Sequence, residues 1–324
     1  DATIASGAVK LSSGDSTVAG NVELSNGVSF GTHGANLTLK SGASVISGGV
    51  GGELLLKSGD GGSGGNVMIE SGIGDVLSGV VHVMSGYSKN GESGQLLMGT
   101  ASGMSSGNVH VAAGTSQTSV SGNVTISGGT SSMSDGGHVM LMSGDGHTSS
   151  GVVSIASGVS SMQSGMVNVV SGASTTTTGE ILIASGVGHD GSGNVHVKSG
   201  AGVLTGDVDV MTGDGVEHSG NIRLTVGHGG VMGGNVVLNG GSGMKLGGSI
   251  LIGAGSVGSM DGVGGDLKLL SGGGGKMSGN ISLTSNTASY DSGNVMINSG
   301  DALHGSGNVL MTSGDSEQQA NGVS

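Results

Sequence analysis

The chain has 324 residues, 75 of them Gly, no Pro, Cys or Trp, and a formal net charge of −13 from 22 acidic and nine basic side chains. Aromatic residues make up only 1%, which excludes the thick core of an ordinary globular domain. The scarcity of Lys and Arg excludes a surface for nucleic acid. Hydrophobic residues still make up 34% and charged residues 10%, the opposite of a disordered composition. We therefore expect apolar side chains to be buried in a thin structure.

A repeat of about fourteen residues runs through the chain, which we predict to be a single repeat array over residues 1–324. Alignment of residues 65–72, 193–200 and 307–314 gives the template Gly-Asn-φ-x-φ-x-Ser-Gly, followed by about six small or polar residues. In chain order, the repeats start near residues 7, 20, 35, 52, 65, 79, 94, 107, 122, 137, 151, 165, 179, 193, 206, 220, 234, 248, 265, 279, 293 and 307.

Two positions of the template are aliphatic in all 22 copies, the residues two and four places after each start. We call them the first and second aliphatic positions. Two apolar residues separated by one, mostly β-branched and bounded by Gly, are typical of a short strand with one buried face. The Gly density excludes a helix, because each Gly in a helix interior costs about 1 kcal/mol.

These patterns predict an all-β fold, a β-solenoid of about 22 coils of about fourteen residues with a thin aliphatic core. The second half of the repeat usually offers one further apolar residue, such as Val76 or Met162, for a shallower second sheet. Coils of one repeat and coils of two repeats both fit the sequence. Asn follows the leading Gly in eleven copies, among them Asn66 and Asn308, and we expect these amides to form a hydrogen-bonded ladder at one edge.

The position between the two aliphatic ones should point outward, yet it carries a surplus of apolar residues. A file of exposed apolar side chains along a sheet indicates a surface that is covered, here by lateral packing against another copy. We call this set the candidate assembly face: Leu55, Met68, Leu97, Met140, Leu182, Val237, Leu251, Met296 and Leu310.

Residues for other chemistry are sparse. Asn36, Asn123 and Asn280 stand in Asn-x-Ser/Thr sequences and are candidate glycosylation sites. His82 and His110 share the outward position but would lie two coils apart, on the order of 10 Å, too far to hold one metal ion. Asp recurs near turns only occasionally, unlike in Ca²⁺-binding nonapeptide repeats. We predict no catalytic residue, no metal site, no cofactor and no enzymatic activity.

The repeat Gly-Asn-Val-x-Ile-x-Ser-Gly resembles the Ser/Gly-rich repeats of large secreted surface proteins of algae and related protists. Its period is also loosely similar to that of the fourteen-residue head coils of trimeric autotransporter adhesins, although the consensus differs. The resemblance covers the whole chain and implies an extracellular or cell-surface location. It carries over no functional residue.

Together these observations predict a structural subunit of an extracellular filament or fibre, assembling end to end, laterally or both. The terminal segments 1–6 and 315–324 are short and repeat-like, and neither resembles a cap, which favours end-to-end stacking or a longer array. The expected partners are other copies of the chain, with a glycan or another surface as a further option. The sequence contains no run of eighteen apolar residues, so we expect no insertion into a membrane. The alternative function is that of a surface-binding solenoid for ice, mineral or glycan.

Overall fold

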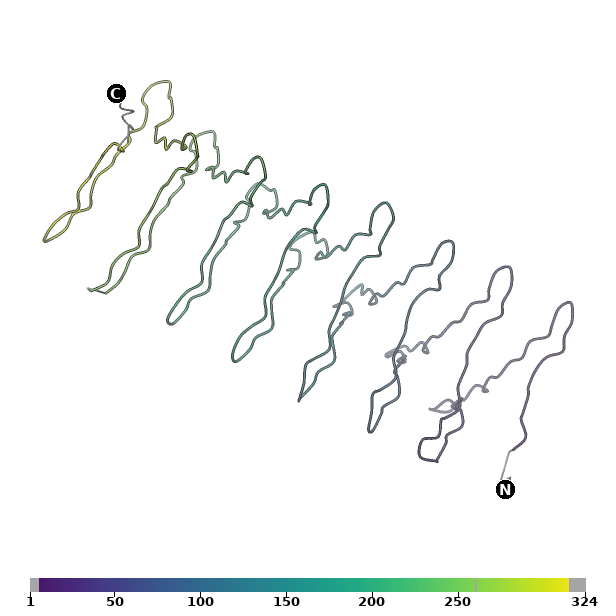
Figure 1. Ribbon diagram of the computed structural model, residues 1–324. Helices are drawn as coiled ribbons and strands as arrows, with labels where there is room; N and C mark the ends of the chain where they lie inside the picture. Colours follow the sequence, from purple (N-terminus) through teal and green to yellow (C-terminus); the bar gives the residue numbers. More distant parts are fainter. Residues whose placement is uncertain (1–5, 260, 315–324) are drawn as a thin grey trace, which may run out of the picture. The chain divides into compact units, whose positions relative to one another are not determined.

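The computed structural model describes residues 6–259 and 261–314 (Figure 1). The chain divides into two units, Asp1–Val167 and Asn168–Ser324, and each follows the same local pattern. Neither unit contains an α-helix or a β-strand within the described ranges. Both are irregular, coil-like chains in which extended segments alternate with loops, as Figure 1 shows.

The backbone bends once in each repeat whose loop the structure describes. In the first unit bends occupy residues 61–63, 75–76 and 89–91, and in the second unit they occupy residues 189–190, 202–204 and 216–217. Each bend lies in the half of the repeat that is rich in Gly and Ser, the residue types that favour turns. We call the template residues between the leading Gly and the Ser-Gly pair of a repeat its aliphatic segment, and the residues from that Ser to the next leading Gly its loop.

The prediction of an all-β solenoid is wrong. A solenoid requires a hydrogen-bonded ladder between successive segments, and no strand occurs in residues 6–259 or 261–314. The backbone hydrogen bonds in these ranges join residues within a single loop or across its two ends, such as Gly79 N to Gly72 O. None of them continues the pairing into the aliphatic segments.

The predicted thin core is also absent, because none of the described residues is buried. The chain exposes 33538 Å², whereas a compact protein of 30.6 kDa exposes only about 12,000 Å² and a fully unfolded one about 44,000 Å². The residues expected to form the second sheet, such as Val76 and Met162, stand fully in solvent in the loops.

The composition of the repeat explains this outcome. Full burial of one aliphatic side chain contributes about 1.5–3 kcal/mol, and ordering the backbone costs about 1–2 kcal/mol for every residue. Gly loses the most conformational freedom, and each repeat offers only two to six Val, Leu, Ile or Met side chains among about fourteen residues. Regular apolar spacing therefore does not by itself hold a segment against its neighbour within one chain.

Two repeats, starting at residues 35 and 248, are seventeen residues long and have longer loops. A hydrogen bond closes a turn at each tip, from Gly49 N to Ile46 O (2.9 Å) and from Gly262 N to Ser259 O (3.3 Å). Gly48 has a φ of 79°, a left-handed conformation that Gly adopts without steric cost. The ends of both loops are joined in the same way as those of shorter loops, so the added residues extend only the tip.

Candidate functional site

The best-defined feature of the chain is the base of its loops, where the Gly of the Ser-Gly pair meets the leading Gly of the next repeat. The leading N–H donates to the carbonyl oxygen of the earlier Gly, for example Gly65 N to Gly59 O at 3.0 Å. The template repeats Gly at both positions, and eight loops are closed in this way within the described residues. Their bonds run from Gly52 to Gly42, Gly65 to Gly59, Gly79 to Gly72, Gly137 to Gly129, Gly151 to Gly144, Gly248 to Gly241, Gly265 to Gly255 and Gly279 to Gly272.

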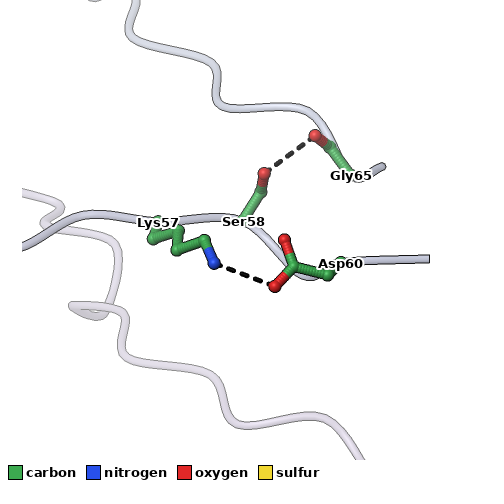
Figure 2. A network of polar contacts seen from close by, with 4 residues as sticks. All are labelled: Lys57, Ser58, Asp60 and Gly65. Carbon is green, nitrogen blue, oxygen red and sulfur yellow. Dashed lines mark hydrogen bonds and ion pairs between the residues drawn. The ribbon is translucent and has the colours of Figure 1, made fainter. Parts of the chain in front are cut away.

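At three loop bases a side chain donates a hydrogen bond to the first residue of the next repeat, and at Gly65 this bond accompanies the backbone bond. Ser58 Oγ donates to the carbonyl oxygen of Gly65 at 2.8 Å, as Figure 2 shows. Thr100 Oγ1 donates to Gly107 O at 3.2 Å, and Asn26 Nδ2 donates to Ala35 O at 3.3 Å. Ser58, Thr100 and Asn26 all occupy the Ser position of the template, so a hydroxyl and an amide can both make this bond.

At some loop bases the leading Gly lies very close to the residue at the Ser position of the template. A Cβ atom at Gly79 would lie 3.2 Å from Ser71 Cβ, and one at Gly65 would lie 3.3 Å from Ser58 Cβ. Both distances are shorter than ordinary contacts between carbon atoms. Gly occupies this position in every repeat except the one that starts with Ala35.

An ion pair stands beside one loop base. Lys57 Nζ lies 2.8 Å from Asp60 Oδ2, on either side of the Ser58-Gly59 pair (Figure 2). Both side chains are largely exposed, so their attraction is weakened by solvent. The pair is an addition to the loop base and is not part of the template.

Analysis of the sequence missed a third position, nine residues after each start, which is Gly or Ser in 19 of 22 repeats. Where it is Gly, a Cβ atom would meet a loop carbonyl, as at Gly74 against Leu77 O and at Gly146 against Ser149 O. In six described repeats where it is Ser, its Oγ accepts a hydrogen bond from a loop N–H, as Ser131 Oγ does from Ser134 N at 2.9 Å. The fixed spacing from the aliphatic positions was the signal that could have revealed it.

The aliphatic positions are graded in exposure. The first aliphatic position is 48–59% exposed in every described repeat except at Val9, and the candidate assembly face is 70–96% exposed. The structure thus places the nine residues of that face in solvent, with no described side chain buried beneath them. Neither position has the environment of a core residue.

The predicted Asn ladder is not present. No hydrogen bond links two of the template Asn side chains anywhere in residues 6–259 and 261–314. Without a ladder of strands to hold them in register, successive amides are not brought together. The candidate glycosylation residues Asn36, Asn123 and Asn280 are all exposed.

The part of the chain that the structure describes has no enclosed binding site. It contains no cavity and no group of three or more His, Cys, Asp or Glu side chains placed to hold a metal ion. His82 and His110 are exposed on separate repeats. No described helix is long and apolar enough to cross a membrane. The expectation about uncapped chain ends falls mainly on residues 1–5 and 315–324, outside the described ranges.

Comparison of the chain with protein-family models, with curated proteins and with solved structures finds no match.

Proposed function

We propose that the chain is a structural protein that associates with copies of itself through its aliphatic segments, forming a filament or fibre outside the cell. One observation carries the proposal. All 22 repeats present two aliphatic residues at fixed positions, and no described residue of the single chain buries them. Exposed apolar surface on this scale indicates a surface that another molecule covers.

A second copy suits these positions because it carries the same spacing. Two arrays with one period match along their whole length, and a shift by one repeat matches again. Many weak contacts then act together, since each bound repeat holds its neighbours near their partners. A partner without the repeat would satisfy only a few of them.

Charge does not oppose such contacts strongly. Charged residues make up 10% of the chain, and the net charge of −13 is spread over 324 residues. Each repeat therefore carries a net charge of less than one unit on average. Repulsion between the copies is weak and is screened by salt beyond about 8–10 Å. The extracellular location rests on the resemblance of the repeat to secreted surface proteins.

No observation favours the alternative of binding to ice, mineral or glycan. That function was expected of a rigid, flat solenoid face, and the described residues form no such face. Glycan binding is weakened further by the shortage of aromatic residues, which make up 1% of the chain.

Light scattering and electron microscopy of the full chain over a range of concentrations test the proposal. We expect growing assemblies above a threshold concentration. A variant with Val→Thr at Val109, Val124, Val139, Val153, Val167 and Val195 should raise that threshold, because Thr keeps the shape of Val but adds a hydroxyl. The matched control places the same six changes in loops, at Val120, Val159, Val187, Val203, Val216 and Val231. A wild-type chain that remains monomeric at high concentration, or equal thresholds for both variants, would contradict the proposal.

A further inference from the structure

Three Asn-Gly pairs lie in the described part of the chain, and all three are exposed. They are Asn26-Gly27, Asn90-Gly91 and Asn239-Gly240, and a fourth pair at residues 321–322 lies outside that part. Gly has no Cβ to shield its backbone nitrogen and lets the chain rotate freely. The nitrogen can therefore reach the side-chain carbon Cγ of the preceding Asn and close a succinimide ring. Ring closure is slowed where either of these two groups is held by another bond.

The pair Asn90-Gly91 is held at the backbone nitrogen. It lies in the bend at residues 89–91, where Gly91 N donates a hydrogen bond to Ser88 Oγ at 3.0 Å. The nitrogen must lose its proton before it attacks Cγ, and the hydrogen bond stabilises the protonated N–H. Ser88 therefore slows ring closure at Asn90.

The pair Asn26-Gly27 is held at the side chain. Asn26 Nδ2 donates a hydrogen bond to Ala35 O at 3.3 Å, at a loop base. Ring closure expels Nδ2 as ammonia and requires Cγ to turn toward Gly27 N, so this bond has to break first. It is longer than an ordinary N–H···O bond, and its protection of Asn26 is correspondingly modest.

The pair Asn239-Gly240 is held at neither group. Among the described residues, no hydrogen bond or ion pair involves Asn239 or Gly240. Residues 232–243 contain no bend, and none of them is buried. Rotation about the backbone of Asn239 therefore displaces no packed group, and both reacting groups are accessible to water.

We propose that Asn239 is the main site of spontaneous deamidation among these three pairs. Gly240 N gives its proton to solvent and attacks Cγ of Asn239, the bond from Cγ to Nδ2 breaks, and Nδ2 takes up a proton and leaves as ammonia. Water then opens the succinimide at one of its two carbonyl groups and gives Asp or isoaspartate at this position. Water is the only co-reactant, and no electron is transferred.

The product changes the character of its repeat. The aliphatic segment that contains Asn239, residues 235–239, has no charged side chain. Deamidation adds a carboxylate directly after Leu238, and isoaspartate also lengthens the backbone by one carbon atom. The inference does not depend on self-association, because the reacting groups are neighbours in one chain.

Incubation of the full chain at mildly alkaline pH, followed by peptide mass spectrometry, tests the proposal. Conversion raises the mass of each peptide, and methylation by an isoaspartate methyltransferase identifies the iso product. We expect the peptide with Asn239 to convert faster than those with Asn26 and Asn90. Asn239→Gln should suppress conversion at that position, because Gln has to close a larger and less favourable ring.

A variant of the protected pair tests the reason for this order. Ser88→Ala releases Gly91 N and should raise the rate at Asn90 about twofold to threefold, the change that corresponds to one exposed neutral hydrogen bond. The matched control is Ser93→Ala, in the same loop, where the lost hydroxyl makes no hydrogen bond among the described residues. Conversion at Asn239 no faster than at Asn26 or Asn90, or equal rates at Asn90 in the Ser88 and Ser93 variants, would each overturn the proposal.

Discussion

The aliphatic segment and the loop of a repeat are constrained in opposite ways. The side-chain hydrogen bonds of the described residues fall in the loops or at their bases, as do the backbone bonds. No such bond in those ranges joins two residues of one aliphatic segment, and Asp266–Lys268 is the one described ion pair with both members in the same segment. Yet the segments carry the two positions that never vary in character across 22 repeats. Local contacts thus account for the loops, whereas the regularity of the segments has no use within a single chain.

The largest change in the threshold concentration for assembly is expected from substitution of leucines that are similarly exposed but lie at different positions of the repeat. Leu97, Leu182, Leu251 and Leu310 lie on the candidate assembly face, and Leu77, Leu204, Leu246 and Leu303 lie in loops, all 79–101% exposed. Changing the first four to Ser should raise the threshold concentration for assembly about tenfold or more, since each buried Leu contributes about 1.5–3 kcal/mol.

The four loop leucines changed to Ser form the matched control, measured by light scattering in the same buffer. Their threshold should stay within about twofold of the wild-type value, because loop side chains are not covered in the proposed assembly. Equal shifts in the two variants would mean that exposed apolar area alone drives association and that position in the repeat does not matter.

A glycine in the loop provides the next test, on the opposite side of the comparison. A Cβ atom in Gly74→Ala would overlap the carbonyl oxygen of Leu77, so the loop must open and the 3.0 Å bond from Gly79 N to Gly72 O should break. Loss of that bond should speed amide exchange at Gly79 by about tenfold at most, the change that corresponds to a hydrogen bond of about 1.5 kcal/mol.

Amide exchange of segmentally labelled protein, followed by NMR, measures this effect. The control is Gly72→Ala, in the same loop, where no atom lies within 4 Å of an added Cβ. If Gly72→Ala speeds exchange at Gly79 as much as Gly74→Ala does, the contact with Leu77 is not what fixes the loop.

The repeat and its turns could be derived from the sequence, but the fold could not. Alternation of aliphatic residues bounded by Gly identifies an extended segment, and the Gly/Ser-rich stretches mark where the backbone bends. The step from extended segments to a hydrogen-bonded solenoid assumed that two aliphatic residues per repeat are enough to order about fourteen. Residues such as Val67 and Ile69 are right for a strand but remain more than half exposed, because no layer covers them.

The loop base could have been predicted from the sequence for a different reason. Its parts are short-range, so the spacing of Ser58, Gly59 and Gly65 already contains the contact. The Gly or Ser that stands nine residues after each repeat start was overlooked because the other loop residues vary in type. In both cases the predictable features are those that one repeat forms with, at most, the first residue of the next.

A smaller effect is expected from the side-chain bond at the loop base. Ser58→Ala removes the 2.8 Å bond from Oγ to Gly65 O but leaves the bond from Gly65 N to Gly59 O. A neutral hydrogen bond contributes about 0.5–1.5 kcal/mol, and exposure places this one at the low end, so exchange at Gly65 should rise about twofold to threefold.

Ser58→Thr should leave that exchange unchanged, since Thr100 makes the equivalent bond to Gly107 O. Ser63→Ala, in the same loop, is the control for loss of a hydroxyl that makes no hydrogen bond among the described residues. A Thr variant as fast as the Ala variant would show that the hydroxyl does not act through the Gly65 carbonyl.

The smallest effect is expected at the ion pair beside the same loop. Asp60→Asn removes the charge that faces Lys57 Nζ at 2.8 Å, but both side chains are largely exposed. Exposed pairs contribute about 0–1 kcal/mol and lose strength in salt. Amide exchange at Gly65 should therefore differ from wild type by less than in Ser58→Ala, and the remaining difference should vanish in concentrated NaCl. An effect of Asp60→Asn that exceeds that of Ser58→Ala would mean that the charges, and not the hydroxyl and backbone bonds, hold this loop closed.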